Sequence, residues 1–214
     1  MVAAATAAAM GETVRTVSPS PHDVAQWRKE KRQQLLAGRA ALPQEARAAA
    51  ARQVSAHVLQ VLDERSIPLA GLTVSGYWPI KSELDLRPFL IACISRGARA
   101  ALPLVETKAS PLVFREWTPE TKMQRSFWNI PVPASTAVVV PDILLSPLVG
   151  WDSEGYRLGY GGGYFDRTLA VLKSPRLVIG VGLQSAAIDT IFPQPHDVRM
   201  DVIVTDAGMQ WCAP

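Results

Sequence analysis

The feature that most constrains the fold is an alternation of apolar and helix-forming segments that begins at about Leu72. Short runs rich in Val, Ile and Leu are typical of buried strands. Strands are expected at 72–78, 99–105, 111–117, within 136–152, at 176–183 and at 200–206, and helices at 85–97 and 164–173. Strands that alternate with helices form βαβ units, so we expect an α/β fold whose mostly parallel sheet is covered on both faces.

Two helices are expected before the first strand. One runs from about Val24 to Ala40, and the next follows Pro43, which suits the first turn of a helix. Apolar residues recur at fourfold spacing in the second helix and form a stripe for packing. This stripe contains Ala46, Ala50, Val54, Val58 and Leu62. The sequence therefore predicts an N-terminal helical pair.

The length of 214 residues suits one domain, which we place at 22–214 after an Ala-rich segment at 1–21. Residues 1–21 lack a basic stretch followed by a Leu- or Val-rich one, so we interpret them as a disordered leader. Cys93 and Cys212 support neither a disulfide framework nor a metal site. No apolar run approaches the roughly 18 residues that a membrane span needs. These features favour a cytoplasmic protein.

Basic residues gather on the first expected helix, although the formal net charge of the chain is only +3. A charge of that size does not by itself predict nucleic-acid binding. Lys29, Arg32 and Arg39 fall on one side of this helix, and Arg28 lies close to the same side. Such a stripe either faces solvent, which is the commoner case, or covers a polyphosphate.

A glycine-rich run, RLGYGGGYFD, occupies residues 157–166. It lacks the Gly-Lys-Ser/Thr ending of a P-loop and the spacing of a dinucleotide-binding fingerprint. Its glycines allow positive φ angles and let backbone amides approach a ligand at the start of the next helix. Arg157 could hold a phosphate through two hydrogen bonds. The glycine count alone is equally compatible with a loop that only packs tightly.

Several other polar and aromatic residues each allow a structural and a functional interpretation. Asp166 either interacts with a helix dipole or binds magnesium near phosphates. A second carboxylate for such a site could come from Asp197 or Asp201. Glu83 is either a charge at a helix N-terminus or an acceptor for a polar heterocycle. Trp128 is either core or a stacking surface for a flat ligand.

The loops at 78–85, 147–164 and 184–198 each follow an expected strand. Ligands of open α/β sheets usually bind beyond the carboxyl ends of the strands, so these loops are expected to converge there. No convincing Ser/His/Asp or Cys/His constellation accompanies them.

Taken together, these segments resemble the 5-formyltetrahydrofolate cyclo-ligases (5,10-methenyltetrahydrofolate synthetases), from about Trp27 to Asp206. The most specific segment, PLVGWDSEGYRLGYGGGYFDRTL, is similar to the family's RLGxGxGYYD region. FWNIPVP and PHDVRMDVIVTD fall in the family's order at matching distances. Many members carry lysine where Gly162 stands, which changes the number of cationic phosphate contacts.

The resemblance implies a three-layer α/β sandwich. It also implies an enzyme that uses ATP and Mg²⁺ to convert 5-formyltetrahydrofolate to 5,10-methenyltetrahydrofolate, with release of ADP and phosphate. In that reaction the formyl oxygen attacks the γ-phosphate, and nitrogen 10 of the folate then closes the ring as phosphate leaves. We expect a monomer whose partners are ATP and a reduced folate, and neither nucleic acid nor a membrane.

The resemblance further implies roles for individual residues. The implied catalytic residues are Arg157, Tyr164 and Asp166, and the implied magnesium ligands are Asp166 and Asp197. The implied ATP site contains Lys29 (or Arg28, one position earlier), Arg32, Arg157, Gly159, Tyr160, Gly161, Gly162, Gly163, Tyr164 and Asp166. The implied folate site contains Tyr77, Glu83, Trp128 and Tyr164.

Other classes of function remain compatible with these residues. One is a non-catalytic folate- or nucleotide-binding protein of the same fold, which only the glycine at position 162 favours. Another is an unrelated sugar-phosphate enzyme on a similar scaffold, since fold does not fix function. RNA binding is disfavoured, because no RNP-like aromatic pattern or basic tail accompanies the basic helix.

Overall fold

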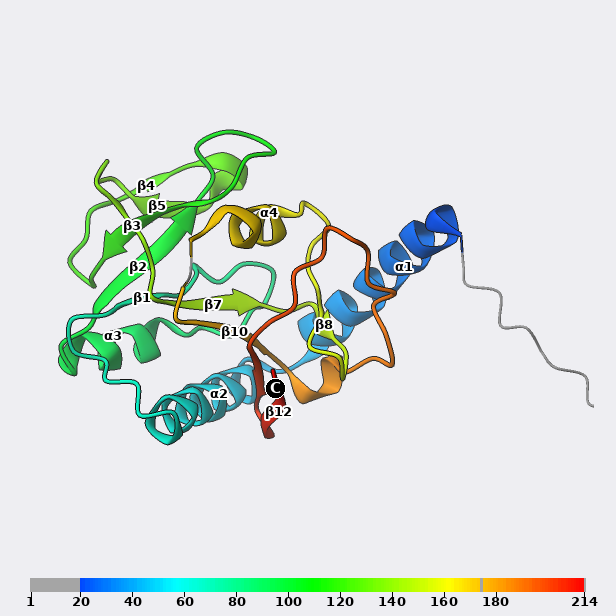
Figure 1. Cartoon of the computed structure of the whole chain (residues 1–214), viewed down its shortest axis with the longest axis horizontal. Helices are drawn as coiled ribbons and strands as arrows, with labels where there is room; N and C mark the ends of the chain where they lie inside the picture. Colours follow the sequence, from blue (N-terminus) through cyan, green and yellow to red (C-terminus); the bar gives the residue numbers. More distant parts are fainter. Residues whose placement is uncertain (1–19, 174, 214) are drawn as a thin grey trace, which may run out of the picture.

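The computed structural model describes residues 20–173 and 175–213 as a mixed sheet enclosed by helices (Figure 1). The helices are α1 (Pro21–Ala41), α2 (Gln44–Glu64), α3 (Arg87–Ser95) and α4 (Tyr164–Val171), with 3₁₀ turns η1 (Phe127–Asn129) and η2 (Gln184–Ala186). The main sheet contains β1 (Thr73–Ser75), β2 (Arg99–Leu104), β3 (Val113–Trp117), β6 (Val138–Val139), β7 (Ile143–Pro147), β10 (Leu177–Gly182), β11 (Val202–Thr205) and β12 (Gly208–Cys212). Two hairpins stand apart from it, β4 (Met123–Arg125) with β5 (Pro131–Pro133), and β8 (Gly150–Trp151) with β9 (Arg157–Leu158).

The expected leader at 1–21 falls almost entirely outside the described residues, which begin at residue 20. Ser20 and Pro21 already belong to the start of α1. Ser20 forms a capping box with Asp23, and Pro21 occupies the first turn. Ser20 supplies a side-chain acceptor for a free backbone amide, and Pro21 supplies a preset φ angle, both of which a helix N-terminus requires.

The strands of the main sheet follow the order β12-β11-β10-β7-β1-β2-β3-β6. The five central strands, from β11 to β2, are parallel, which confirms the α/β fold with a mostly parallel sheet. β3 and β12 pair antiparallel on either flank. β12 corrects the expectation that the segment at 200–206 is the last strand. The chain turns at Gly208, whose φ of 111° suits glycine, and returns along the outer edge of β11.

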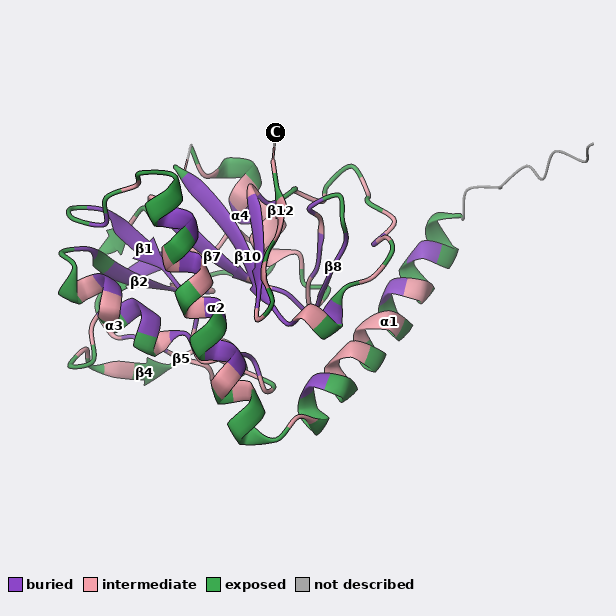
Figure 2. Ribbon diagram, turned by 90° about the horizontal axis from the view of Figure 1, so that it is seen from below, coloured by how far each residue is buried: buried purple, intermediate pink, exposed green. Residues whose placement is uncertain are grey.

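Helices cover both faces of the sheet and make it the middle of three layers (Figures 1 and 2). α2 and α3 lie on one face, and α4 lies on the other. Val54, Val58 and Leu62 of α2 join the core as the fourfold stripe predicts, whereas Ala46 in the first turn is exposed. Cys93 of α3 is fully buried as expected, and burial raises the pKa of its thiol to about 12.

α1 differs from the other long helix in how it is attached. It crosses the carboxyl end of the sheet and exposes most of its surface (Figure 2). Its buried residues are Val24, Arg28 and Arg39, so much of its attachment comes from arginines that reach loop carbonyls. Within the described residues, no helix is both long and apolar enough to cross a bilayer.

Candidate active site

A cavity of about 500 Å³ lies at the carboxyl edge of the sheet, between α1 and α4. The three loops expected to converge all contribute to it. Tyr77 to Glu83 follow β1, and His196 and Asp197 follow β10. Pro147 ends β7, and the glycine loop comes after it in the chain, directly behind β9. Residues near η1 and the β4–β5 hairpin form a further, aromatic wall. The parallel strand order brings these distant segments together because it aligns the carboxyl ends of β1, β7 and β10.

The glycine loop passes from β9 to α4 and lies against an arginine of α1. The Arg32 Nε donates to the Gly159 carbonyl at 2.7 Å, and a Cβ placed on Gly161 would lie 3.4 Å from the Arg32 guanidinium carbon. Gly161 has a φ of 93°, and Gly163, with a φ of 63°, is the N-cap of α4. The loop thus needs glycine both for its backbone angles and for this close approach.

Gly162 is constrained by a different neighbour. A Cβ at this position would lie 2.9 Å from Cδ2 of Tyr164. The Tyr164 ring therefore occupies the space in which a longer side chain at 162 would begin. The Arg167 guanidinium lies 4.9 Å from the centre of that ring and donates to the Gly162 carbonyl at 2.6 Å.

Arg157 and Asp166, at the two ends of the glycine loop, form an ion pair of 2.9 Å in which Arg157 is buried and Asp166 is half-buried. Burial lowers the pKa of Arg157, and the neighbouring Asp166 carboxylate opposes this effect. The Oδ1 of Asp166 also accepts from the Val198 amide at 3.2 Å. Both contacts use one carboxylate oxygen, and no hydrogen bond among the described residues reaches Oδ2 of this cavity-lining residue.

Arg28 and Asp197 form a second pair at the cavity wall, in which two guanidinium nitrogens bind the two carboxylate oxygens at 3.2 and 2.5 Å. Arg28 also donates to the carbonyls of Ile191 and Phe192. Burial raises the pKa of Asp197, but hydrogen bonds from Arg28 and the Gln194 amide outweigh it and leave the pKa below its usual range.

The sequence left two alternatives open, Arg28 or Lys29 and Asp197 or Asp201, and in each pair only one residue lines the cavity. Arg28 lines the cavity, whereas Lys29 is exposed on α1 and is not part of the lining. Asp197 also lines the cavity. Asp201 instead accepts from the Val178 amide at 2.7 Å near the amino end of β10, at the opposite edge of the sheet.

The cavity lining also contains a buried carboxylate, Glu83. It accepts hydrogen bonds from the Tyr160 hydroxyl at 2.9 Å and from the Ile80 amide at 2.8 Å. Burial raises its pKa, while those hydrogen bonds and nearby Arg39 oppose the increase. The ring of Tyr77 is buried beside it, and its hydroxyl donates to the Leu84 carbonyl at 3.0 Å. Burial raises the pKa of Tyr77 well above its usual value.

Aromatic side chains form the rim. Trp128 is 62% exposed, which excludes the core interpretation, and its ring centre lies 5.6 Å from that of Tyr164 in an edge-to-face arrangement. Its φ of 55° is a left-handed conformation that tryptophan seldom adopts. Phe127 and Trp78 complete this apolar side. Sequence reasoning missed both, although Phe127 adjoins Trp128 in the same motif.

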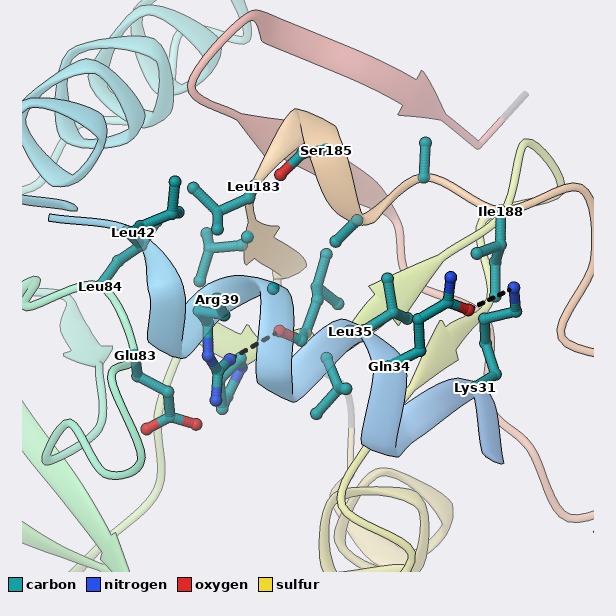
Figure 3. A pocket seen from close by; sticks show the side chains of 18 of the residues that line it. Lys31, Gln34, Leu35, Arg39, Leu42, Glu83, Leu84, Leu183, Ser185 and Ile188 are labelled. Carbon is teal, nitrogen blue, oxygen red and sulfur yellow. Dashed lines mark hydrogen bonds between the residues drawn. The ribbon is translucent and has the colours of Figure 1, made fainter. Parts of the chain in front are cut away.

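A second cavity of about 470 Å³ lies beneath α1 and shares Tyr77, Glu83 and Pro147 with the first (Figure 3). Its lining is mainly aliphatic. Gly38 of α1 faces it, with no atom within 4 Å of where a Cβ would stand. Glu83 lines both cavities, whereas Arg39 lines only the second one.

No preassembled metal centre accompanies the cavity. Among residues 20–173 and 175–213, no group of three or more His, Cys, Asp or Glu side chains could hold a metal ion. A divalent cation here would depend on oxygen atoms brought by a ligand. Such a site suits magnesium, which typically binds one or two carboxylates together with phosphate oxygens.

The sequence model of the 5-formyltetrahydrofolate cyclo-ligase family matches residues 24–206. The chain belongs to this family. The 5-formyltetrahydrofolate cyclo-ligase of Mycolicibacterium smegmatis is 32% identical over 151 residues, which are 65% of this chain and 76% of that protein. The Escherichia coli K12 cyclo-ligase is 34% identical over 147 residues, or 65% and 81% of the two chains.

Solved structures support the same assignment. The Aquifex aeolicus 5,10-methenyltetrahydrofolate synthetase superposes with a TM-score of 0.70 at 27% identity, covering 86% of this chain and 91% of that one. The Mycoplasma pneumoniae synthetase has a TM-score of 0.66 at 24% identity, with 84% and 98% covered, and supports the fold. Membership of the cyclo-ligase family makes this chain an enzyme of the ligase class that belongs to folate one-carbon metabolism.

Proposed function

We propose that this cyclo-ligase converts 5-formyltetrahydrofolate to 5,10-methenyltetrahydrofolate, using ATP and Mg²⁺ and releasing ADP and phosphate. The observation that carries the proposal is a single cavity with two chemically different sides. One side has arginines and a glycine loop, and the other has a buried carboxylate and aromatic rings. A polyphosphate suits the first side, and a flat heterocycle with hydrogen-bond donors suits the second.

The phosphate side is assigned to Arg28, Arg32, Arg157 and the loop from Gly159 to Gly163. Within the described part of the chain, Arg28 and Arg157 have carboxylate partners, whereas no salt bridge involves Arg32. Burial lowers the pKa of Arg32, and the neighbouring Arg28 lowers it further. The charge of the Asp197 carboxylate opposes these effects. A phosphate bonded directly to this half-buried cation would compensate its burial more fully. Lys29 is the weaker candidate because it is exposed and lies outside the cavity.

Magnesium is assigned to the phosphate end of α4. Asp166 is the direct ligand in this proposal, because both of its hydrogen-bonded contacts use Oδ1. The N-terminus of α4 beside it favours the phosphate that would share the ion. Asp197 has both oxygens bound to Arg28. It can serve as a second ligand if Arg28 turns one nitrogen toward a phosphate, and otherwise it contributes negative charge near the ion.

The folate side is assigned to Glu83, Tyr77, Trp128 and Tyr164. As a carboxylate, Glu83 can accept from the N–H groups of a reduced pterin, and its burial strengthens that interaction. Trp128 and Tyr164 present ring surfaces on which the flat part of the substrate can stack. Because Gly162 has no Cβ to displace the Tyr164 ring, the ring can occupy this position in the site before a ligand binds.

ATP supplies the phosphoryl group that makes the formyl oxygen a leaving group, and this needs no protein nucleophile. The residues of the chain bind the two substrates side by side, neutralise phosphate charge and exclude water. Arg157 and Tyr164 act in this scheme by positioning, Arg157 at the phosphates and Tyr164 between phosphate and folate.

The test is a turnover assay. Purified protein with ATP, Mg²⁺ and 5-formyltetrahydrofolate should produce the absorbance of the methenyl product, together with stoichiometric ADP. A non-hydrolysable ATP analogue and a chelator should each abolish the rise. If a folded sample binds folate tightly yet consumes no ATP, the protein is a non-catalytic binder and the proposal fails.

A further inference from the structure

Arg39 lines the cavity beneath α1 (Figure 3) and binds three segments of the chain. It is 8% exposed and lies near the end of α1. Its Nε and one terminal nitrogen donate to the Lys81 carbonyl at 3.2 and 3.0 Å, and the other terminal nitrogen donates to the Leu148 carbonyl at 3.3 Å. It also donates to the Tyr160 hydroxyl. The arginine thus holds the β1 loop, the end of β7 and the glycine loop together.

Tyr160 carries this connection to the carboxylate of the folate side. Its hydroxyl accepts from Arg39 and donates to Glu83 at 2.9 Å. Its ring centre lies 5.7 Å from the Arg39 guanidinium carbon and 5.2 Å from the Lys81 ammonium. The backbone of Tyr160 belongs to the glycine loop, between the two glycines that contact Arg32. One residue therefore has its main chain on the phosphate side and its hydroxyl on Glu83.

The loop that carries Glu83 depends on this support. Lys81 and Ser82 have φ angles of 46° and 62°, left-handed conformations that are unfavourable for residues other than glycine. Arg39 binds the Lys81 carbonyl, and the Glu83 carboxylate binds the Ile80 amide. A strained loop persists only where its surroundings fix it, so a shift of the glycine loop would alter the position of Glu83.

We propose that Arg39 and Tyr160 are positioning residues that couple the nucleotide and folate sites, so that each substrate binds more tightly when the other is present. The inference rests on the proposed function. Phosphates that order the glycine loop would fix the Tyr160 hydroxyl and hold Glu83 in its accepting position. Coupling of this kind is reciprocal, and its typical size is about 5- to 150-fold in affinity.

The experiment measures the dissociation constant of 5-formyltetrahydrofolate by calorimetry, with and without Mg²⁺ and a non-hydrolysable ATP analogue. In the wild-type enzyme the analogue should tighten folate binding at least about fivefold. Tyr160→Phe should reduce this factor to near one. The matched control is Tyr156→Phe in the β8–β9 turn, whose ring packs under Arg199 outside the cavity, and it should keep the full factor.

A pH profile separates positioning from general structural damage. Glu83 is faced by Arg39 from α1, by Tyr160 from the glycine loop, and by Lys81 and Tyr77 from its own loop. The Tyr160 hydrogen bond and the Arg39 charge both lower the Glu83 pKa. Tyr160→Phe and Arg39→Met should therefore move the acid limb of folate binding to higher pH, whereas Arg39→Lys should largely retain its position.

The outcomes distinguish this inference from the proposed function. If the wild-type enzyme turns over but the analogue leaves folate affinity unchanged, the coupling is wrong and the function stands. If Tyr160→Phe is folded and keeps both the coupling factor and the acid limb, Tyr160 has no positioning role. If the wild-type enzyme gives no product at all, the proposed function itself has failed.

Discussion

Arginines with different partners surround the nucleotide side of the cavity. Arg28 and Arg157 are neutralised by carboxylates, and Arg39 is held by carbonyls and a tyrosine hydroxyl. Arg32 is the exception in the described part of the chain, since its recorded hydrogen bond goes to the Gly159 carbonyl and it forms no salt bridge. Because buried charge is unfavourable without compensation, Arg32 has the most to gain from a phosphate.

We therefore expect Arg32→Gln to raise the KM for MgATP by roughly 10- to 100-fold, since a hydrogen bond to a charged group contributes about 1.5–3 kcal/mol. The KM for folate should change much less when measured at saturating ATP. Lys29→Gln, which removes an exposed charge from the same helix, is the control and should leave both values near wild type. Equal losses in the two variants would contradict the assignment of Arg32.

At the scale of single elements, α1 carries an internal glycine whose effect can be isolated. Gly38 lies within this helix, and a Cβ there would have no atom within 4 Å. Gly71 also has open space around it, but its φ is 79°. The two glycines therefore differ in backbone conformation while sharing free space.

Gly38→Ala should raise the free energy of unfolding by about 0.5–1 kcal/mol, because alanine favours the helix interior. Gly71→Ala should lower it by about 1 kcal/mol or more, because alanine is strained at positive φ. Urea denaturation of the two variants measures both effects. Destabilisation by Gly38→Ala would mean that α1 or the cavity beneath it tolerates no added methyl group.

The elements also show how far local sequence patterns reach. The apolar runs predicted the parallel strands and the stripe on α2 because burial on both faces imposes a strong pattern. The apolar runs did not predict the β8–β9 hairpin or β12. These strands are only two to five residues long, and their pairing depends on tertiary packing rather than on local sequence. A two-residue strand such as Gly150–Trp151 has no periodicity to detect.

At the scale of the whole molecule, one site residue makes stability depend on pH. Burial raises the pKa of Glu83 in the folded state above that of the unfolded chain, about 4.3–4.5. The folded state then binds this proton more tightly. Its contribution to stability is complete below the unfolded pKa and is lost as the pH rises through the folded pKa.

Relative to Glu83→Gln, the ligand-free wild-type enzyme should therefore lose stability as the pH rises above about 4.5, by up to about 1.4 kcal/mol for each pH unit until the folded pKa is passed. Urea denaturation of both proteins at several pH values measures the difference. A constant difference between pH 4 and 8 would show that Glu83 titrates alike in the folded and unfolded states.

The site was predictable where a motif marked it and not where three-dimensional pairing decided it. The glycine run, Glu83 and Trp128 stood out as candidates, and the structure places them around one cavity. The sequence did not decide whether Arg28 or Lys29 contacts the phosphates. Neighbouring residues on a helix point in different directions, so one of them can be buried and the next exposed. The link from Arg39 through Tyr160 to Glu83 joins residues separated by 121 and 77 positions, and no local pattern reveals such a link.

The polar character of α1 makes it a candidate for local unfolding that inactivates the enzyme. A helix attached largely by arginine side chains, and exposed over most of its surface, can detach in a local unfolding event while the sheet and its other helices stay intact. Such an opening would remove Arg28 and Arg32 from the first cavity and Arg39 from the second. Proteases that cut in α1 would then inactivate the enzyme without unfolding its core. Bound nucleotide, by engaging Arg28 and Arg32, would protect it.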